Sequence, residues 1–582
     1  MRRAVPICLI LECLLVVTFP QSVPLVRANT SYYPQVLTHE ISYTESDAGG
    51  IGESSVDVDP MNSSIFAVAA LNFYGPFRTE GFPAFYSMDS GATWTEVGPS
   101  GPPLFGNSYP GFNDPQVSFD ANGNVFLGWG VFVPPQDLSV VQYYLLKSVD
   151  QGKTYSYLTN PPLANNVTYL FPDGSYKTPC SARTTFPVID YPKLAIDKSS
   201  VSHYEGNIYV NGAIWFNATG TGCMAYPAFA RSTDGGNTWS NRTVISDFSG
   251  YAEGADNIAI APDGTIYRMA AGSCSDSEGL ALEKSIDGGQ TFSDLCVYDS
   301  PGVLNARDHA TVVVSPTDPA RMWVSFQAIP VGQTADHIYV MSSSDVGASW
   351  SVPSRVDNIL QNDNVEHEMP SMSISSTGRL DVEWRDFRLS TNSSTADVFY
   401  SWSLDGGNTW GNGTEIRLTS TTGTYCFTPA CNSNDFMSII SMADRTFAFY
   451  STSPDNNDLD GEVSTVSFRD FNASPSTDML DVPWNSSASL EIMVQSLNNF
   501  TGTVKVSVSN DGWVGNNRDL YGYPQPTSIL IASGGNGTVI FYVRSYSWST
   551  PGTYKFTIDL SNEGPWGSID HTIAITAVLN CC

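Results

Sequence analysis

The sequence predicts an all-β protein built from repeats and followed by a second β-rich region. Three observations support this prediction. An eight-residue phrase, Ser-x-Asp-x-Gly-x-Thr/Ser-aromatic, occurs six times. Glycine, proline and aromatic residues are plentiful, as turn-rich β proteins require. No long stretch shows the apolar period of an amphipathic helix.

Each copy of the phrase is expected to form a hairpin turn. A short apolar run such as AFY or YYLLK precedes each copy, and another extended run follows it. The aspartate can accept hydrogen bonds from the N–H groups of the turn, and the glycine can adopt a positive φ. The aromatic residue is expected to pack where the next strand begins. These turns are expected to be structural, and their aspartates are Asp89, Asp150, Asp234, Asp287, Asp345 and Asp405.

The phrase resembles the Asp-box, and roughly residues 35–470 are similar to the sialidase-like (BNR repeat) β-propellers. The resemblance implies that each box caps the hairpin between the third and fourth strands of a blade. It also implies that the boxes lie on the face away from the active site. The boxes therefore indicate the fold and say little about chemistry.

A second repeat precedes each box and predicts the number of blades. It consists of an acidic residue, a strand, a polar turn and another strand. A seventh copy begins at Asn434, lacks a box, and has GEVSTVSF from Gly461 as its expected third strand. The run Val36–Tyr43 has no blade of its own, and pairing it into the last blade would close the ring. Seven four-stranded blades are favoured, and six blades with an extra hairpin are the alternative.

The repeat stops near Asn472, and alternating apolar and polar residues continue to the C-terminus. This pattern predicts an antiparallel β-sandwich of Ig-like type. The expected domains are a signal peptide over residues 1–28, the propeller over 29–470 and the sandwich over 471–582.

The N-terminus and the cysteines predict export to the extracellular space or the cell surface. Arg2 and Arg3 precede the apolar run Val5–Phe19, and Ala28 ends a small-residue cleavage site. An uncleaved anchor is the alternative, and no later stretch is apolar enough to span a bilayer. Metal-binding spacings such as CxxC are absent, so disulfides are the better interpretation. The expected pairs are Cys180–Cys223, Cys274–Cys296 and Cys426–Cys431.

The formal net charge is −31 and the sequence pI is near 4.3, although only 15% of residues are charged. This balance argues against nucleic acid as a partner, because no basic stripe is available. The expected partner is a glycan or glycoprotein. No cofactor is required.

One repeat position is acidic in every expected blade. If the seven-blade alignment holds, these carboxylates surround one mouth of the central channel, opposite the boxes. One interpretation is that each caps the entry turn of a strand. The other is that they bind a cation or a ligand, because converging carboxylates repel one another unless they are protonated or paired. The residues are Glu53, Asp114, Asp190, Asp256, Asp308, Glu368 and Asp435.

Cationic residues are expected on the same face. They are Arg78, Arg307, His309, His367, Arg385 and Arg388. Sialidases bind the sugar carboxylate with three arginines and use a tyrosine nucleophile, a glutamate and an aspartic acid/base. The resemblance implies Tyr425, Glu383 and Asp114 as counterparts. The Arg-Ile-Pro motif of that family is absent, and the segment around Arg78 reads PFRTEG.

The segment Asp455–Glu462 contains N-x-D-x-D-G, the first half of a calcium loop. Its candidate calcium ligands are Asn456, Asp458 and Asp460. Ser467 stands where the bidentate acid is expected, and a plain polar turn is the alternative.

The sequence is compatible with two functions. The first is recognition of extracellular glycans at the carboxylate-lined mouth, with hydrolysis by a sialidase-like glycoside hydrolase as its extension. The second is a non-catalytic adhesion or cell-envelope protein that uses the propeller as a scaffold.

Overall fold

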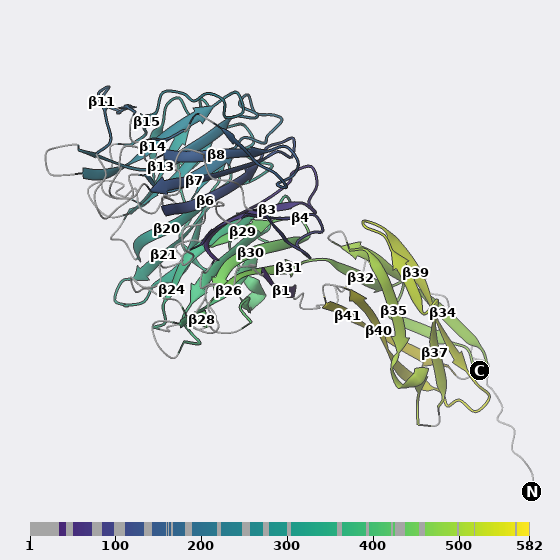
Figure 1. Cartoon of the computed structure of the whole chain (residues 1–582). Helices are drawn as coiled ribbons and strands as arrows, with labels where there is room; N and C mark the ends of the chain where they lie inside the picture. The colour runs from purple at the N-terminus through teal and green to yellow at the C-terminus, as the bar shows by residue number, and fades with distance from the viewer. Residues whose placement is uncertain are drawn as a thin grey trace, which may run out of the picture. The chain divides into compact units, whose positions relative to one another are not determined.

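A computed structural model gives the fold of the chain (Figure 1). The described residues are 34–41, 51–72, 84–97, 111–132, 142–158, 160, 162–164, 167–180, 189–217, 223–246, 257–271, 279–299, 304–357, 364–390, 395–420, 423–424, 437–452, 460–497, 500–516, 518–564 and 567–580.

The four main strands of each of the first three blades pair antiparallel in chain order. Blade 1 contains β2 (Ile51–Val58), β3 (Phe66–Asn72), β4 (Ala84–Ser87) and β5 (Thr95–Val97). Blade 2 contains β6 (Gly111–Phe119), β7 (Val125–Phe132), β8 (Gln142–Ser148) and β9 (Ser156–Leu158). Blade 3 contains β12 (Ile189–Ile196), β13 (Ile208–Asn217), β14 (Cys223–Ser232) and β15 (Thr243–Val244), extended by β10 (Tyr169–Leu170) and β11 (Tyr176–Lys177).

The next three blades repeat the pattern. Blade 4 contains β16 (Ile258–Ile260), β17 (Ile266–Ala271), β18 (Gly279–Ser285) and β19 (Ser293–Asp299). Blade 5 contains β20 (Leu304–Val314), β21 (Met322–Pro330), β22 (His337–Ser343) and β23 (Ser354–Arg355). Blade 6 contains β24 (His367–Ile374), β25 (Leu380–Asp386), β26 (Thr395–Ser403), β27 (Ile416–Arg417), β28 (Gly423–Thr424) and the 3₁₀ turn η1 (Gly411–Gly413).

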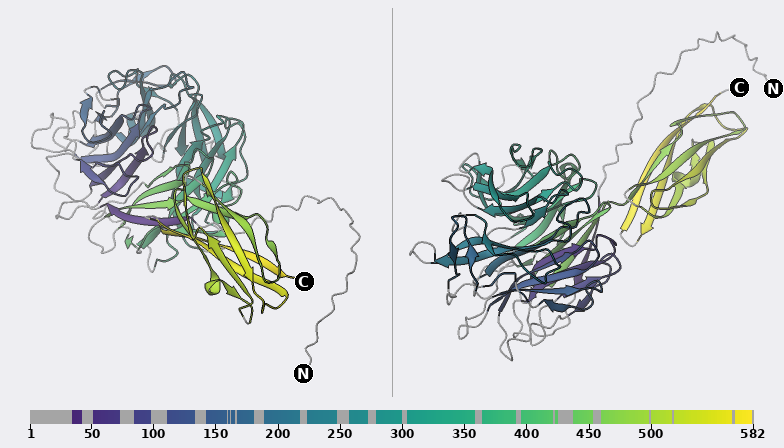
Figure 2. Two further views of the ribbon diagram at one scale, coloured as in Figure 1. Left: turned by 90° about the vertical axis from the view of Figure 1, so that its right-hand side faces the viewer. Right: turned by 90° about the horizontal axis from the view of Figure 1, so that it is seen from above.

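Blade 7 contains β29 (Ser438–Ser441), β30 (Arg445–Thr452), β31 (Asp460–Ser467) and, from the N-terminal end of the chain, β1 (Gln35–Ile41). The first strand of each blade contacts the first strand of the next blade, and β29 contacts β2, so the ring is closed. The prediction of seven blades is confirmed. Figure 2 shows the blades in two further views.

The predicted ring closure is also confirmed. β1 pairs antiparallel with β31 over its whole length, from Gln35 opposite Ser467 to Ile41 opposite Gly461. Figure 1 shows β1 beside β31. The Thr38 hydroxyl lies 2.8 Å from that of Ser464, and it donates a hydrogen bond to the Leu418 carbonyl at 3.1 Å. A strand from the start of the chain thus covers the outer edge of the last blade.

All six Ser-x-Asp turns have the hydrogen bonds that the sequence predicts. In the turn at Asp234, the Ser232 hydroxyl donates to Oδ1 at 2.8 Å, and the Thr238 N–H donates to the same oxygen at 2.8 Å. The Thr238 hydroxyl donates to Oδ2 at 2.6 Å. The Gly236 N–H donates to the Ser232 hydroxyl at 2.8 Å. Each turn joins the third and fourth strands of a blade, so the turns share one face of the propeller.

Packing explains why a glycine and an aromatic residue occur in each of these turns. Gly91 has φ +84°, and a Cβ atom built there would lie 2.5 Å from the Phe447 ring of the neighbouring blade. Gly289 has φ +80° and faces Phe229 of its neighbour in the same way. The aromatic residues pack against hydrophobic clusters of the blades, as predicted, and are Trp94, Tyr155, Trp239, Phe292, Trp350 and Trp410.

Neighbouring blades are joined at the channel by side chains that accept backbone hydrogen bonds. The first strand of each blade is an edge strand, because only one of its sides pairs within the sheet. Six junctions have an acceptor on the preceding blade and an N–H on the first strand of the following blade. The pairs are Ser438–Val56, Ser55–Val117, Asp114–Tyr191, Asn257–Val312, Gln327–Met369 and Ser373–Ser441, at 2.7–3.2 Å.

The C-terminal region is a sandwich of two five-stranded sheets. One contains β32 (Asp470–Pro475), β34 (Ser487–Leu497), β39 (Asn536–Ser545), β37 (Leu520–Gln525) and β36 (Trp513–Val514). The other contains β33 (Met479–Val482), β41 (Gly567–Leu579), β40 (Gly552–Gly564), β35 (Gly502–Val508) and β38 (Ser528–Ile531), with the 3₁₀ turn η2 (Ser509–Gly512) after β35.

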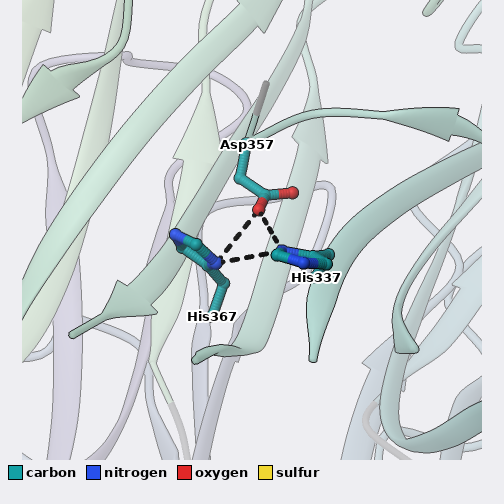
Figure 3. Close-up of side chains that lie close together, drawn as sticks. All are labelled: His337, Asp357 and His367. Carbon is teal, nitrogen blue, oxygen red and sulfur yellow. Dashed lines mark hydrogen bonds and ion pairs between the residues drawn. The ribbon is translucent and has the colours of Figure 1, made fainter. Parts of the chain in front are cut away.

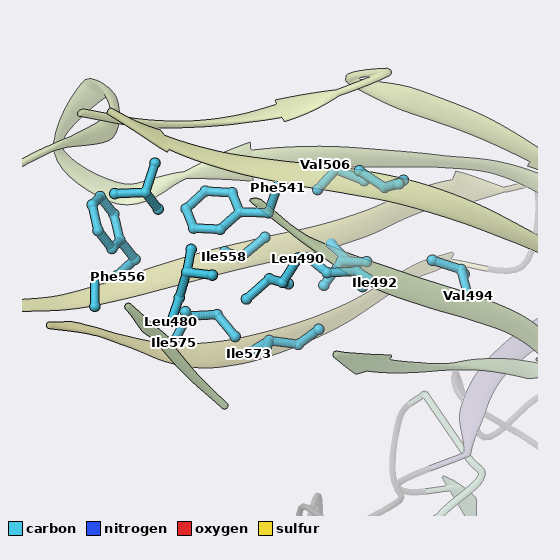
Figure 4. Close-up of a cluster of buried hydrophobic side chains, with 14 of the residues drawn as sticks. Leu480, Leu490, Ile492, Val494, Val506, Phe541, Phe556, Ile558, Ile573 and Ile575 are labelled. Atoms are coloured by element: carbon cyan, nitrogen blue, oxygen red, sulfur yellow. The ribbon is translucent and has the colours of Figure 1, made fainter. Parts of the chain in front are cut away.

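The period-two pattern of the sequence builds the core of this sandwich. Along β34 every second residue is buried, including Leu490, Ile492 and Val494. These residues meet Phe541, Ile558 and Ile575 of other strands between the two sheets (Figure 4). β33 pairs in parallel with β41, whereas the other strand pairs are antiparallel.

One predicted disulfide is confirmed. Cys180 and Cys223 are bonded, with their Cα atoms 6.2 Å apart, and the bond ties the segment after β11 to β14. Cys296 on β19 is disulfide-bonded as well, while its predicted partner Cys274 lies outside the described residues. Cys426 and Cys431 also lie outside them. Among the described residues, no helix is long and apolar enough to cross a membrane.

Removal of β1 should destabilise the propeller. Deleting residues 29–45 exposes the outer edge of β31, and we expect aggregation or a melting temperature lower by roughly 5 °C or more. Thermal unfolding and light scattering measure both effects. Deletion of residues 29–33 alone leaves β1 intact and serves as the control. Equal melting temperatures of the two deletion variants would contradict the proposal that β1 stabilises the propeller.

Because of the turn aspartates, the stability of the fold should depend on pH. Hydrogen bonds from Thr238 and Ser232 lower the pKa of Asp234 to about 2. A carboxylate with a depressed pKa stabilises the fold above its unfolded pKa, and this contribution is lost as pH falls through the folded value. We expect Asp234→Ala to lower the melting temperature at pH 7 by about 1–2 °C. The difference from wild type should shrink between pH 4 and pH 2.

The matched controls are Asp234→Asn, which keeps an acceptor for the turn, and Glu205→Ala at an exposed site of the same blade. A pH-independent effect of Asp234→Ala would show that the carboxylate charge is not what stabilises the turn.

Candidate functional site

Strand direction places the candidate residues on the face opposite the six turns. The first and third strands of a blade begin on this face, and the second and fourth strands end on it. Asp114, His309 and Glu368 lie near the start of first strands, and Arg385 lies near the end of a second strand. The sequence-predicted acidic and basic residues of the described chain thus share one face.

The acidic repeat residues of blades 1, 2, 3, 5 and 6 lie at β-bulges. The first strands of five blades shift register there, between Gly52 and Ser55 in blade 1 and between Asn113 and Gln116 in blade 2, for example. Four bulges contain a non-glycine residue in the left-handed region, namely Asp114, Tyr191, His309 and Met369, with φ between 44° and 64°. The bulges explain why the spacing of the acidic residue varies between repeats.

Asp114 accepts a structural hydrogen bond. Its side chain is 4% exposed, and its Oδ2 accepts the Tyr191 N–H of the next blade at 3.0 Å. Tyr191 is itself a left-handed bulge residue. The contact supports the capping interpretation of this aspartate.

A cavity of about 180 Å³ lies inside the channel, and all seven blades contribute to its wall. Its polar lining includes Gln116, Lys193, His309 and Thr311. Met369, Met372, Met437 and Ile439 supply apolar surface. The described lining contains no carboxylate. A wider cavity of about 750 Å³ lies at the other end of the first strands, where Lys198 pairs with Asp57 at 2.5 Å.

Two predicted substrate-binding arginines are paired within the chain. Arg385 is fully buried, and its Nη1 donates to Glu368 Oε1 at 3.0 Å. Arg388 contacts Asp386 through Nε at 2.9 Å and Glu415 through Nη1 at 2.5 Å, and it lies over the Phe399 ring. Burial lowers the pKa of Arg388, but these two carboxylates outweigh burial and raise it. Both guanidiniums therefore hold blade 6 together.

Glu383 lies away from the cavity. Its side chain is fully buried on β25 beside Tyr450 of β30, and neither carboxyl oxygen has a hydrogen-bond partner among the described residues. Burial raises the pKa of Glu383 well above its ordinary value. Burial, followed by the charge of Glu462, raises the pKa of Tyr450. Burial therefore favours the neutral forms of Glu383 and Tyr450, which lie between blades 6 and 7.

A cluster of two histidines and one aspartate joins blades 5 and 6 on the same face (Figure 3). His337 begins β22, Asp357 follows β23 and His367 begins β24. All three side chains are fully buried. Asp357 Oδ2 lies 2.9 Å from His337 Nδ1 and 3.1 Å from His367 Nδ1, and the two nitrogens are 3.2 Å apart.

Charged neighbours surround this cluster. Arg355 contacts Asp357 Oδ2 at 3.0 Å, and Asp386 lies 3.3 Å from His367 Nε2. Burial lowers the pKa of His367, but Asp386 and Asp357 outweigh burial and raise it. Burial raises the pKa of Asp357, but the two histidines and Arg355 outweigh that effect and lower it. The sequence predicts only His367 as a site residue. His337 begins β22 and Asp357 follows β23, and neither residue occupies the acidic position of the repeat.

Several predicted site residues cannot be placed. Those outside the described residues are Arg78, Asp256, Tyr425, Asp435, Asn456 and Asp458. Others lie on described strands, but their side chains are outside the description, and these are Glu53, Asp190, Arg307, Asp308 and Asp460. The calcium loop and the tyrosine nucleophile therefore stay predictions.

No family model matches the chain, and no curated protein matches it. Solved structures with a similar fold include an α-L-arabinofuranosidase of Fusarium graminearum in complex with an iminosugar inhibitor. It is 12% identical over 74% of this chain and 92% of that chain, with a TM-score of 0.29. An endo-arabinase of Bacteroides thetaiotaomicron is 13% identical over 64% and 96%, with a TM-score of 0.26. Likenesses this distant do not bear on the activity of this chain.

The capping role of Asp114 can be separated from its charge. Asparagine accepts the Tyr191 N–H and tolerates the left-handed region, whereas alanine does neither. We expect Asp114→Asn to change the free energy of unfolding by less than about 0.5 kcal/mol and Asp114→Ala to lower it by about 2 kcal/mol. Denaturant unfolding measures both. Equal losses in the two variants would show that the charge, rather than the cap, is required.

Proposed function

We propose that the protein is an exported glycan-binding protein whose ligand enters the central channel on the face opposite the six turns. The cavity lined by all seven blades carries this proposal. Hydroxyl, amide, imidazole and ammonium groups line it, and these groups hydrogen-bond to sugar hydroxyls. Apolar side chains beside them match the C–H face of a sugar ring. The confirmed disulfide is compatible with an extracellular protein.

The ammonium group of Lys193 favours an acidic sugar. Lys193 lines the cavity, and the described lining includes no aspartate or glutamate. Lys193 is only 5% exposed, so its ammonium group meets a ligand in a water-poor setting where charge–charge attraction is strong. This composition is consistent with the sialidase-like resemblance of the sequence, which implies a ligand with a carboxylate.

Binding is better supported than hydrolysis. Most glycosidases need two carboxyl groups at the glycosidic bond, whereas sialidases use a tyrosine nucleophile. Asp114 is occupied as a cap, and Glu383 is enclosed between blades. A sialidase-like cleavage would require Tyr425 and residues of its segment, which lie outside the described residues. The alternative of a non-catalytic scaffold predicts no glycan binding in the channel.

A glycan panel tests the proposal. We expect the exported protein to bind acidic glycans and Lys193→Met to weaken that binding at least tenfold. Lys198→Met changes the same residue type at the opposite end of the channel and should leave binding unchanged. Release of reducing sugar, measured on the same panel, tests hydrolysis separately. Absence of binding to every glycan, or equal losses in both variants, would rule out the proposed site.

A further inference from the structure

We propose that His337, Asp357 and His367 bind a divalent transition-metal ion, such as Zn²⁺ or Fe²⁺, between blades 5 and 6. The three side chains come from three different strands and meet at one point (Figure 3). Two imidazole nitrogens favour zinc or iron over calcium and magnesium, which prefer oxygen ligands, and a carboxylate oxygen can bind any of these ions. The site is separate from the predicted calcium loop.

The spacing of the three atoms fits a shared metal ion. His337 Nδ1, His367 Nδ1 and Asp357 Oδ2 are separated by 2.9, 3.1 and 3.2 Å. Ligand atoms bound at about 2.0–2.2 Å lie about 2.8–3.1 Å apart in octahedral geometry and about 3.3–3.6 Å apart in tetrahedral geometry. An ion to one side of the plane of the three atoms, at about 2.1 Å from each, would therefore need little movement of the side chains.

The other ring nitrogens are oriented as they are in metal sites. His337 Nε2 lies 3.2 Å from Gln333 Oε1, and His367 Nε2 lies 3.3 Å from Asp386 Oδ2. A neutral imidazole that carries its proton on Nε2 presents an Nδ1 lone pair on the opposite side, and the negative charge of Asp386 beside His367 Nε2 favours that tautomer. Both lone pairs and Asp357 Oδ2 then converge on one point. Three converging acceptors attract a cation.

The surrounding residues hold the acceptors in place. Asp357 Oδ1 accepts the Ile338 N–H at 2.9 Å, which directs Oδ2 toward the histidines. Trp384 Nε1 donates to Asp386 Oδ2 at 2.9 Å, and Arg388 contacts the same carboxylate. Partners of this kind fix the orientation of ligands and are part of a metal site.

The charges around the site leave room for one cation. Among the described residues, Asp357, Asp386 and Glu415 pair with two guanidiniums, those of Arg355 and Arg388. Arg355 Nη2 lies 2.8 Å from His337 Nδ1 and approaches the same point. Its side chain is 20% exposed, so it can turn toward solvent or keep only its contacts with Asp357. A proton on His367 is the competing source of positive charge.

The remaining coordination positions and the role of the ion follow from the same geometry. Among the described residues no fourth histidine, cysteine, aspartate or glutamate joins the cluster. Water would complete the coordination, and Gln333 at the exposed side marks the path by which it enters. The ion would tie the third and fourth strands of blade 5 to the first strand of blade 6.

Metal binding by the full exported chain tests the proposal. After removal of metals with EDTA, we expect one Zn²⁺ or Co²⁺ ion bound per chain at the cluster. Co²⁺ should give the visible absorption of a nitrogen- and oxygen-ligated site, and added Zn²⁺ should raise the melting temperature. Asp357→Asn and His367→Gln should each weaken binding at least tenfold.

His571→Gln is the matched control, because His571 forms a similar pair with Asp470, at 2.6 Å, in the sandwich. Its metal binding should equal that of wild type. Wild-type protein that binds neither ion and whose melting temperature does not respond to Zn²⁺ would overturn the proposal, even if the variants fail to fold. Unchanged binding in folded Asp357→Asn and His367→Gln would overturn it as well.

Discussion

The unpaired inner edge of each blade is the constraint on which the propeller depends. Seven first strands meet at the channel, and each pairs with its own sheet on one side only. Buried N–H groups on the other side need acceptors, because leaving one unpaired costs about 1–3 kcal/mol. The preceding blade supplies a side-chain acceptor at six junctions, as Ser55 does for Val117 and Asn257 for Val312. These hydrogen bonds fix how neighbouring blades pack, and the β1–β31 pairing closes the ring that they form.

This constraint also determines which polar groups are available to a ligand. A side chain that caps the next blade cannot reorganise around a sugar without exposing a backbone N–H. Asp114 caps the Tyr191 N–H in this way, and the buried Arg385 is paired with Glu368. Lys193, His309 and Thr311 line the cavity inside the channel. Asp114 therefore acts as a cap, the described lining of the cavity contains no carboxylate, and each remaining position of the predicted carboxylate ring has to be assigned from its own contacts.

The sequence predicts local and periodic features well. The Ser-x-Asp turns depend on contacts within seven residues, and the ring closure follows from counting strands, so both could be read without a structure. The Cys180–Cys223 pair was predicted because both cysteines belong to one blade. The pairing of Arg388 with Asp386 and Glu415 and the enclosure of Glu383 could not be predicted, because packing between strands decides them. His337 and Asp357 were missed because neither occupies a repeated position.

A departure from the repeat is more informative here than the repeat itself. Capping side chains and turn aspartates recur from blade to blade, and recurrence is what a shared structural task produces. Among the described residues, the one cluster of this kind lies where blade 5 meets blade 6. Three buried titratable side chains at a single junction would cost stability through desolvation unless a cation or proton compensated them. The cluster lies on the face that also holds the channel mouth, and this position favours a specific function over a structural one.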